Sequence, residues 1–304
     1  MKSEQTLSLT LTERAGWRDY LELTKPRVVA LMILTAVIGM LLARPVLPSW
    51  QVLVWGNLGI ALLAGAAAVI NHVVDHKVDA LMARTRKRPV AQGRVNTLDA
   101  LLFAAILGLS GLFLLLWKIN ALTAWLTLAS LLGYAVVYTL FLKRATPQNI
   151  VIGGLAGAMP PLLGWTAVTG HVDPNALLLV LIIFAWTPPH FWALAIHRKE
   201  EYARVGIPML PVTHGNRYTE LHILLYTLVL LAVSVFPFLT GMSGGVYLVG
   251  ALLLGARFLH YSLRLWRGDD RRVALDTFKY SITYLMALFV VLLVDHFVMV
   301  EGVG

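Results

Sequence analysis

The stretch of sequence that decides the fold is QVLVWGNLGIALLAGAAAVI (residues 51–70), which runs directly into NHVVDHKVD (residues 71–79). An apolar run of about 20 residues is what an α-helix needs to cross the hydrocarbon core of a bilayer, so the first part predicts a membrane span. The polar residues that follow are spaced four apart, at Asn71, Asp75 and Asp79. Each step of four turns a helix by about 40°, so these three side chains are predicted to share one helix face.

The composition of the whole chain supports the same class of protein. Of its 304 residues, 58% are hydrophobic and only 13% are charged, which is too apolar for a soluble protein. The apolar runs are continuous, whereas the strands of a membrane β-barrel alternate apolar and polar residues. The sequence therefore predicts an all-α polytopic membrane protein. The absence of cysteine excludes disulfides, thiolate metal sites and a cysteine nucleophile.

Nine apolar stretches have a length close to the ~20 residues that a bilayer requires. They lie at residues 28–47, 51–73, 98–117, 121–141, 148–168, 176–196, 221–240, 244–262 and 279–299. We therefore expect nine transmembrane helices that form a single membrane-embedded domain over residues 28–299. A cytoplasmic segment at residues 1–27 precedes this domain, and it shows no pattern of a cleavable signal peptide.

The distribution of basic residues predicts the orientation of the bundle. Of the 25 Lys and Arg residues, only Arg44 and Lys118 fall outside the connections on one side of the predicted membrane. The positive-inside rule then places the N-terminus in the cytoplasm and the C-terminus on the periplasmic side, in a multi-pass protein of the cell inner membrane. The net charge of +9 is mostly a topology signal. We expect a lipid bilayer around the protein and no nucleic-acid partner.

The carboxylates of Asp75 and Asp79 would repel one another unless a cation lay between them. Mg²⁺ takes oxygen ligands and is commonly completed by substrate phosphates, so these two residues with Asn71 are candidate ligands. The basic run RTRKRP (residues 84–89) follows and would hold phosphate oxygens that the metal does not. The alternatives are a solvated helix end for the acidic residues and a topology anchor for the basic ones.

A second group of polar residues lies in and after the sixth span. Pro188 and Pro189 are expected to break the helix in mid-membrane and to leave a cavity there. His190 follows this break, and an ionisable residue at membrane depth is a candidate site residue. The alternative is an interior histidine bonded to a backbone carbonyl. Lys143 and Arg144 add cations on the same predicted membrane face as Asp75.

Further motifs reveal a resemblance to a known family. They are LTKPR (residues 23–27), TPQN (146–149), the Gly153–Gly154 pair, PHFWALAI (189–196) and GIPMLPV (206–212). Together with the helix face of Asn71, Asp75 and Asp79, these motifs make the chain resemble the UbiA superfamily of intramembrane prenyltransferases from about residue 20 to about residue 299. The last two motifs are similar to those of the branch that farnesylates protoheme IX. The superfamily usually has a second Asp-rich motif after the sixth span, where this chain has Glu200 and Glu201, so the number of metal ions stays open.

The resemblance implies a reaction in which farnesyl diphosphate ionises at its allylic carbon and the vinyl group of heme b attacks. Water then captures the new cation, which gives the hydroxyethylfarnesyl heme (heme O) of terminal oxidases. The resemblance implies six catalytic residues, which are Asn71, Asp75, Asp79, Arg84, Arg88 and Lys143. It implies that Mg²⁺ is bound by Asn71, Asp75, Asp79 and Glu201. It implies that His190, Arg198 and His214 contact the substrates. Heme-pathway or oxidase-assembly proteins are the implied protein partners.

Other functions fit parts of the sequence. A UbiA-type enzyme with a quinone or chlorophyll-type acceptor would carry the same acidic face. A secondary transporter would normally place ionisable residues deep inside several spans rather than at one end of the bundle. A heme-carrying electron-transfer subunit would need paired histidines inside the spans, whereas most histidines here lie near predicted cytoplasmic ends.

Overall fold

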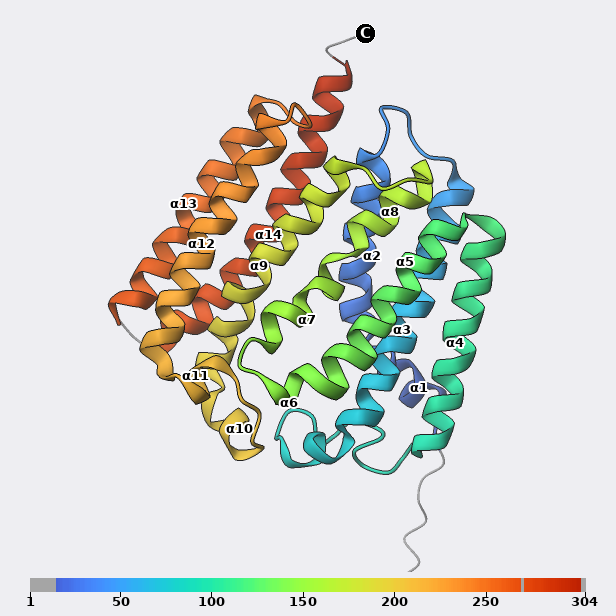
Figure 1. Ribbon diagram of the computed structural model, residues 1–304, viewed down its shortest axis with the longest axis vertical. Coiled ribbons are helices and arrows are strands. Elements are labelled where there is room, and N and C mark those ends of the chain that lie inside the picture. The colour runs from blue at the N-terminus through green and yellow to red at the C-terminus, as the bar shows by residue number, and fades with distance from the viewer. Residues whose placement is uncertain (1–14, 269–270, 302–304) are drawn as a thin grey trace, which may run out of the picture.

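The computed structural model describes residues 15–268 and 271–301, and all the regular elements in these ranges are helices (Figure 1). A helix satisfies its own backbone hydrogen bonds, which suits a chain of long apolar runs in a bilayer. Residues 1–14 of the predicted N-terminal segment and residues 302–304 at the predicted periplasmic end lie outside the described residues.

The helices follow the predicted stretches closely. They are α1 (Trp17–Leu23), α2 (Pro26–Leu42), α3 (Trp50–Leu81), α4 (Thr97–Lys118), α5 (Ala121–Leu132), the π-helical η1 (Gly133–Leu142), α6 (Lys143–Ala145), α7 (Asn149–Ala158), α8 (Pro160–Thr169), α9 (Pro174–His197), α10 (Lys199–Arg204), α11 (Leu210–Thr213), α12 (Gly215–Leu239), α13 (Gly245–Arg267) and α14 (Arg271–Glu301). Within the described residues, eight helical stretches are long and apolar enough to cross a membrane. The pair α1 and α2, bent by 51°, adds a ninth if it is one span.

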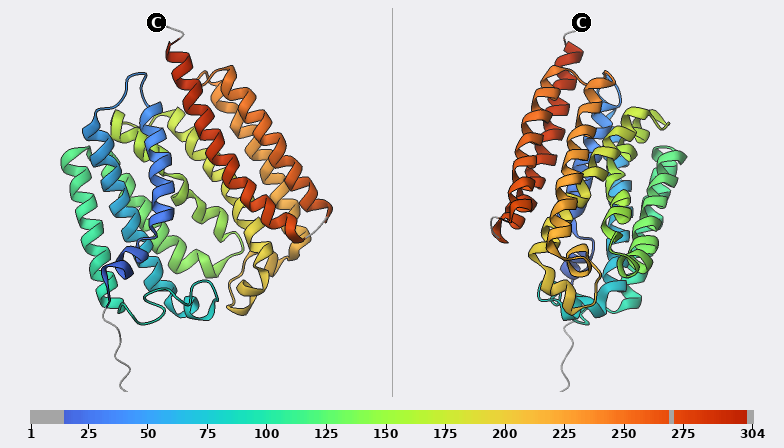
Figure 2. Two further views of the ribbon diagram at one scale, coloured as in Figure 1. Left: turned by 180° about the vertical axis from the view of Figure 1, so that it is seen from behind. Right: turned by 60° about the vertical axis from the view of Figure 1, so that its left-hand side comes forward.

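Helix α9 lies at the centre of the bundle. It packs against α7, α8, α12 and α14, while α13 packs against both α12 and α14 to one side (Figures 1 and 2). On the other side α2 packs against α8 and α3, and α3 packs against α4. The candidate site described below lies among α2, α3, α5, η1, α7, α8 and α9.

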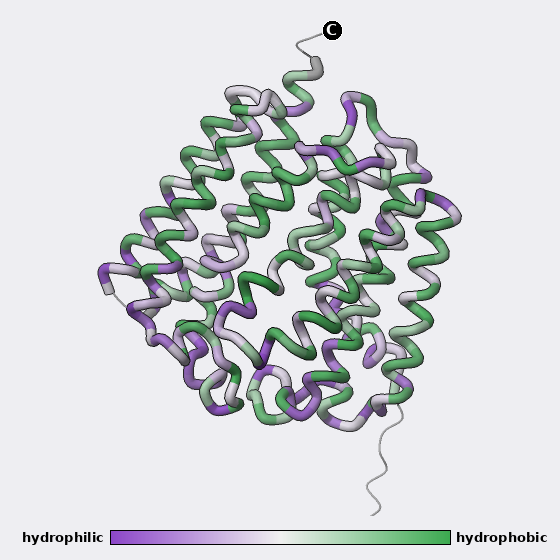
Figure 3. The backbone as a smooth tube through the Cα atoms, viewed as in Figure 1, coloured by the Kyte–Doolittle hydropathy of each residue, from purple (hydrophilic) through white to green (hydrophobic). Residues whose placement is uncertain are grey.

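Polar residues gather at the two ends of the bundle and apolar residues fill its middle (Figure 3). One end carries α1, α6, α10, α11 and the connection 82–96, and the last turn of α14 lies at the other (Figure 1). This arrangement is the one expected when an odd number of spans separates the two ends of the chain. The direction in which the bundle crosses the membrane stays a prediction.

The predicted break at Pro188 and Pro189 is wrong, because α9 continues as one helix through both residues. Each proline removes one backbone donor, which would free two carbonyls of the preceding turn. The Thr187 hydroxyl donates to the Ile183 carbonyl at 2.8 Å, and the residues from Ala185 to His190 are all buried in the bundle. The two prolines thus lie inside a continuous helix that packs on neighbouring helices, where the sequence alone suggested a break.

Helices α2 and α8 touch through their backbones. A Cβ atom added to Gly39 would lie 2.1 Å from the Pro161 carbonyl oxygen, and one added to Gly164 would lie 2.0 Å from the Ala36 carbonyl oxygen. Glycine at both positions allows this approach, as small residues commonly do between membrane helices. The contact fixes the second half of α2 against α8.

Candidate active site

The predicted acidic face lies on the last turns of α3. Asn71, Asp75 and Asp79 have exposed fractions of only 4%, 2% and 4%, so they do not form a solvated helix end. All three residues are helical, since α3 extends to Leu81. We call these three residues the oxygen face.

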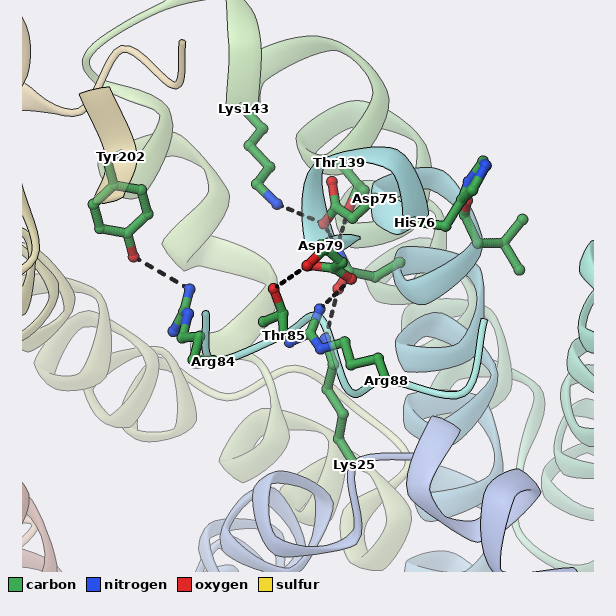
Figure 4. A network of polar contacts seen from close by, with 12 residues as sticks. Lys25, Asp75, His76, Asp79, Arg84, Thr85, Arg88, Thr139, Lys143 and Tyr202 are labelled. Atoms are coloured by element: carbon green, nitrogen blue, oxygen red, sulfur yellow. Dashed lines mark hydrogen bonds and ion pairs between the residues drawn. The ribbon is translucent and has the colours of Figure 1, made fainter. Parts of the chain in front are cut away.

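Cationic side chains from other segments hold the carboxylates of the oxygen face (Figure 4). The Oδ2 atom of Asp75 accepts from Lys143 Nζ at 2.5 Å and from Asn71 Nδ2 at 2.8 Å. The Oδ2 atom of Asp79 accepts from Arg88 Nη1 at 2.6 Å. The structure therefore brings together five of the six predicted catalytic residues, and it does so from three separate segments of the chain.

The donor chemistry of the oxygen face fits Mg²⁺. Each carboxylate uses its Oδ2 atom for a cationic partner, and neither Oδ1 atom accepts a hydrogen bond from a described residue. These two carboxylate oxygens and the Asn71 amide oxygen are hard donors on one side of one helix, which is the ligand type that Mg²⁺ prefers.

Lys25 is a member of the site that the sequence analysis did not assign. Its Nζ atom donates to Asn71 Oδ1 at 2.6 Å. Lys25 lies at the bend between α1 and α2 and has a φ of 51°, the only positive φ at a non-glycine position among the described residues. A left-handed residue of this kind costs about 1–2 kcal/mol. The available signal in the sequence was a lysine directly before the first span, inside the LTKPR motif.

The connection 82–96 folds over the end of α3. The Thr85 hydroxyl donates to the Asp79 carbonyl at 3.0 Å, and Arg88 reaches the Asp79 carboxylate from the same connection. Arg84 is exposed and points the other way, where its Nη2 atom lies 3.4 Å from the Tyr202 hydroxyl on α10 (Figure 4). The basic run thus contributes directly to the oxygen face through Arg88, and Arg84 links the connection to α10.

An apolar cavity of about 540 Å³ begins beside Lys25 and extends between α2, α3, α5, η1, α7, α8 and α9. This volume lies in the range of about 300–1,000 Å³ that ligand pockets usually have. Tyr134 and Tyr138 line it with stacked rings whose centroids are 5.5 Å apart. A Cβ atom on Gly153 would lie 2.1 Å from the Tyr138 ring, so glycine there makes room for this tyrosine.

His190 lines the same cavity and is only 7% exposed. Its ring stacks on Trp186 at a centroid distance of 4.1 Å and on Phe278 at 4.6 Å. Its Nδ1 atom lies 2.7 Å from the Ser281 hydroxyl oxygen. The polar partner of His190 is therefore a side-chain hydroxyl rather than the backbone carbonyl considered from the sequence.

Three further predicted residues lie away from the cavity lining. His214 is exposed and stacks on Tyr218 at 5.0 Å, and Arg198 is partly exposed at the start of α10. Glu201 is partly buried, and its Oε2 atom is enclosed without a hydrogen-bond partner among the described residues. Within the described part of the chain, no three acidic or histidine side chains are close enough to hold one metal ion, so Glu201 does not join Asp75 and Asp79. The roles expected for these three residues stay predictions.

Comparisons with known proteins show the family and the fold of the chain. The chain is 79% identical to the protoheme IX farnesyltransferase of Marinobacter nauticus, over 99% of this chain and 100% of that protein. The structure of a digeranylgeranylglyceryl phosphate synthase superposes with a TM-score of 0.79 at 19% identity, covering 92% of this chain and 98% of that one. A UbiA homolog from Archaeoglobus fulgidus, solved with GPP and Mg²⁺, superposes with a TM-score of 0.60 at 17% identity over 90% and 99% of the two chains. Residues 32–293 match the UbiA prenyltransferase family, and the chain belongs to that family.

Proposed function

We propose that this prenyltransferase moves the farnesyl group of farnesyl diphosphate to a vinyl group of protoheme IX (heme b) and so produces heme O. The observation that carries the proposal is the position of Lys25, which donates to Asn71 of the buried oxygen face and also lines the apolar cavity that contains His190. The relative in Marinobacter nauticus, which is named for this reaction, supports the choice of acceptor because it matches the chain over nearly its whole length.

The diphosphate end of the substrate would bind at the oxygen face. Mg²⁺ held by Asn71, Asp75 and Asp79 would neutralise charge on the departing diphosphate, as metal ions do for leaving oxygens. Lys25, Arg88 and Lys143 already point their nitrogen atoms at these three residues and would donate to the remaining diphosphate oxygens. The Archaeoglobus homolog supports this arrangement, since it has the same fold and was solved with GPP and Mg²⁺.

The apolar cavity would hold the farnesyl chain and the porphyrin. Bond cleavage leaves the electron pair of the allylic C–O bond on the diphosphate and an allylic cation on the farnesyl group. The stacked rings of Tyr134 and Tyr138 lie in the cavity wall and would stabilise this cation through their faces. The apolar lining would exclude water from the cation until the acceptor reacts.

The terminal vinyl carbon of heme would then bond to the cationic farnesyl carbon, and positive charge would move to the inner vinyl carbon next to the porphyrin. One water molecule adds there and loses a proton, which completes the hydroxyethylfarnesyl substituent. His190 would lie against the heme in this arrangement, because it lines the cavity from α9. Arg84, Arg198, His214 and Glu201 would act from the end of the bundle around α10 and the connection 82–96.

We place the enzyme in the inner (cytoplasmic) membrane with the oxygen face toward the cytoplasm, because nearly all Lys and Arg residues lie at that end. Water-soluble diphosphate would then leave into the cytoplasm. Proteins of the heme pathway or of oxidase assembly would receive the product.

The test is an assay with purified protein in bilayer nanodiscs, heme b, farnesyl diphosphate and Mg²⁺, with products identified by mass spectrometry. We expect heme O and free diphosphate in equal amounts, and no product after EDTA until Mg²⁺ is restored. Heme left unmodified, together with prenylation of a quinone precursor supplied in a parallel reaction, would contradict the proposed acceptor.

A further inference from the structure

The hydrogen bonds around His190 define which of its ring nitrogens carries the proton. The Ser281 hydroxyl donates its single proton to the Phe278 carbonyl at 2.6 Å, because a carbonyl oxygen can only accept. The Ser281 oxygen is therefore left to accept from His190 Nδ1 at 2.7 Å. His190 is thus held with the proton on Nδ1 and a lone pair on Nε2.

The surrounding aromatic side chains fix the plane of the His190 ring. Trp186 stacks on it with an angle of 20° between the rings, and Phe278 stacks on it with an angle of 30°. Trp186 is itself anchored, since its Nε1–H donates to the Ser281 backbone carbonyl at 2.7 Å. One turn of α14 therefore orients both the imidazole and the indole that covers it.

The free lone pair on Nε2 belongs to His190, which lines the cavity. Nδ1 is engaged with α14 and the ring lines the cavity, so Nε2 is the atom available to a ligand. His190 is the only histidine among the described residues that line this cavity. An imidazole whose Nδ1–H is bonded to a fixed acceptor is the usual form of a histidine that binds a metal through Nε2.

We propose that Nε2 of His190 binds the heme iron as an axial ligand, and that Ser281 is a positioning residue that holds His190 in the required tautomer and orientation. This inference rests on the proposed function, because it assumes that heme is the acceptor. Ligation would fix the height of the porphyrin in the cavity and hence the place of its vinyl groups relative to the farnesyl carbon.

The test is a titration of the purified full-length protein with ferric heme, without farnesyl diphosphate, followed by absorption and electron paramagnetic resonance spectra. We expect the parent protein to show a histidine-ligated heme. His190→Ala should lose this signature, and added imidazole should restore it. Ser281→Ala should keep the fold and bind heme about 10–100-fold more weakly, the usual effect of removing the hydrogen-bond partner of a metal-binding histidine.

Ser262→Ala is the matched control. Ser262 is a fully buried serine of the neighbouring helix α13 that is bonded to Thr227 at 2.8 Å, and it does not line the cavity. This variant should keep the parent spectrum and affinity. Binding of farnesyl diphosphate, measured separately, should be the same in all variants.

The outcomes separate this inference from the proposed function. If the parent makes heme O but His190→Ala binds heme with the parent spectrum and affinity, axial ligation by His190 is refuted and the proposed function stands. If Ser281→Ala matches Ser262→Ala in heme affinity and spectrum, the positioning role of Ser281 is refuted. If the parent makes no heme O under any condition, the proposed acceptor is wrong. The heme spectra of the same samples then still test whether His190 binds the heme iron.

Discussion

Neutralising Asp75 is the sharpest perturbation of the oxygen face. Asp75→Asn keeps the shape of the side chain and removes one negative charge at a position that is 2% exposed and 2.5 Å from Lys143 Nζ. Two unit charges about 4 Å apart at an effective dielectric constant of about 20 interact with about 4 kcal/mol. If the bound metal and diphosphate lose one interaction of this size in the transition state, the rate falls by about a thousandfold, since about 1.4 kcal/mol is tenfold.

The assay measures kcat for farnesyl transfer to heme in nanodiscs, together with the Mg²⁺-dependent affinity for a non-hydrolysable farnesyl diphosphate analogue. Asp99→Asn is the control, because Asp99 is an exposed carboxylate in the first turn of α4. Activity of Asp75→Asn within tenfold of the parent, at equal amounts of folded protein, would refute the assigned role of the oxygen face.

A folding defect can be separated from a chemical one. Asp75→Asn leaves the cation of Lys143 without its carboxylate, and this cation is partly buried. The double variant Asp75→Asn with Lys143→Gln removes the unpaired charge, so thermal stability should recover while activity stays low. Recovery of activity along with stability would show that the carboxylate acts only through folding.

Three further outcomes follow from the structure. Reporter fusions after residues 95 and 172 should report the cytoplasm and the periplasm respectively, and a periplasmic signal at residue 95 would overturn the predicted orientation. Lys25→Met should lower kcat/KM for farnesyl diphosphate by about 10–100-fold, because a charge-assisted hydrogen bond is worth about 1.5–3 kcal/mol. Lys77→Met is the control, because Lys77 is exposed. Equal kinetics in the two variants would show that Lys25 is not part of the site. Gly153→Ala should lower thermal stability by about 1–3 kcal/mol because its Cβ would meet the Tyr138 ring at 2.1 Å. Gly157→Ala, whose Cβ would meet nothing within 4 Å, should leave the melting temperature unchanged, and equal melting temperatures in both variants would contradict the packing argument.

Much of the fold was predictable because membrane spans depend on the length and composition of local apolar runs. The nine predicted stretches each coincide with a helix or a consecutive set of helices. The shared face of Asn71, Asp75 and Asp79 was predictable for a similar reason, since it depends only on helical periodicity within α3.

The missed features depend on contacts between segments that are far apart in the chain. Lys25 reaches Asn71 across 46 residues, and no periodicity indicates such a pairing. Helix α9 continues through Pro188 while packed against α7, α8, α12 and α14, and the residues next to the proline do not indicate these contacts. Ser281 lies 91 residues after His190, so the hydrogen-bond partner of that histidine could not be predicted from the local sequence either.

The π-helical segment η1 has a consequence for how the enzyme can change in evolution. Its wider turns pair each backbone N–H with a carbonyl five residues earlier, and the Lys143 N–H still bonds to the Tyr138 carbonyl in this way. The direction in which Lys143 leaves the helix therefore depends on the number of residues in η1 as well as on its own identity. A single-residue deletion there would return the segment to α-helical spacing and rotate every later side chain by a fraction of a turn, which would carry the ammonium group away from Asp75. Insertions and deletions between residues 133 and 142 should consequently be selected against even where each individual side chain in that stretch is replaceable.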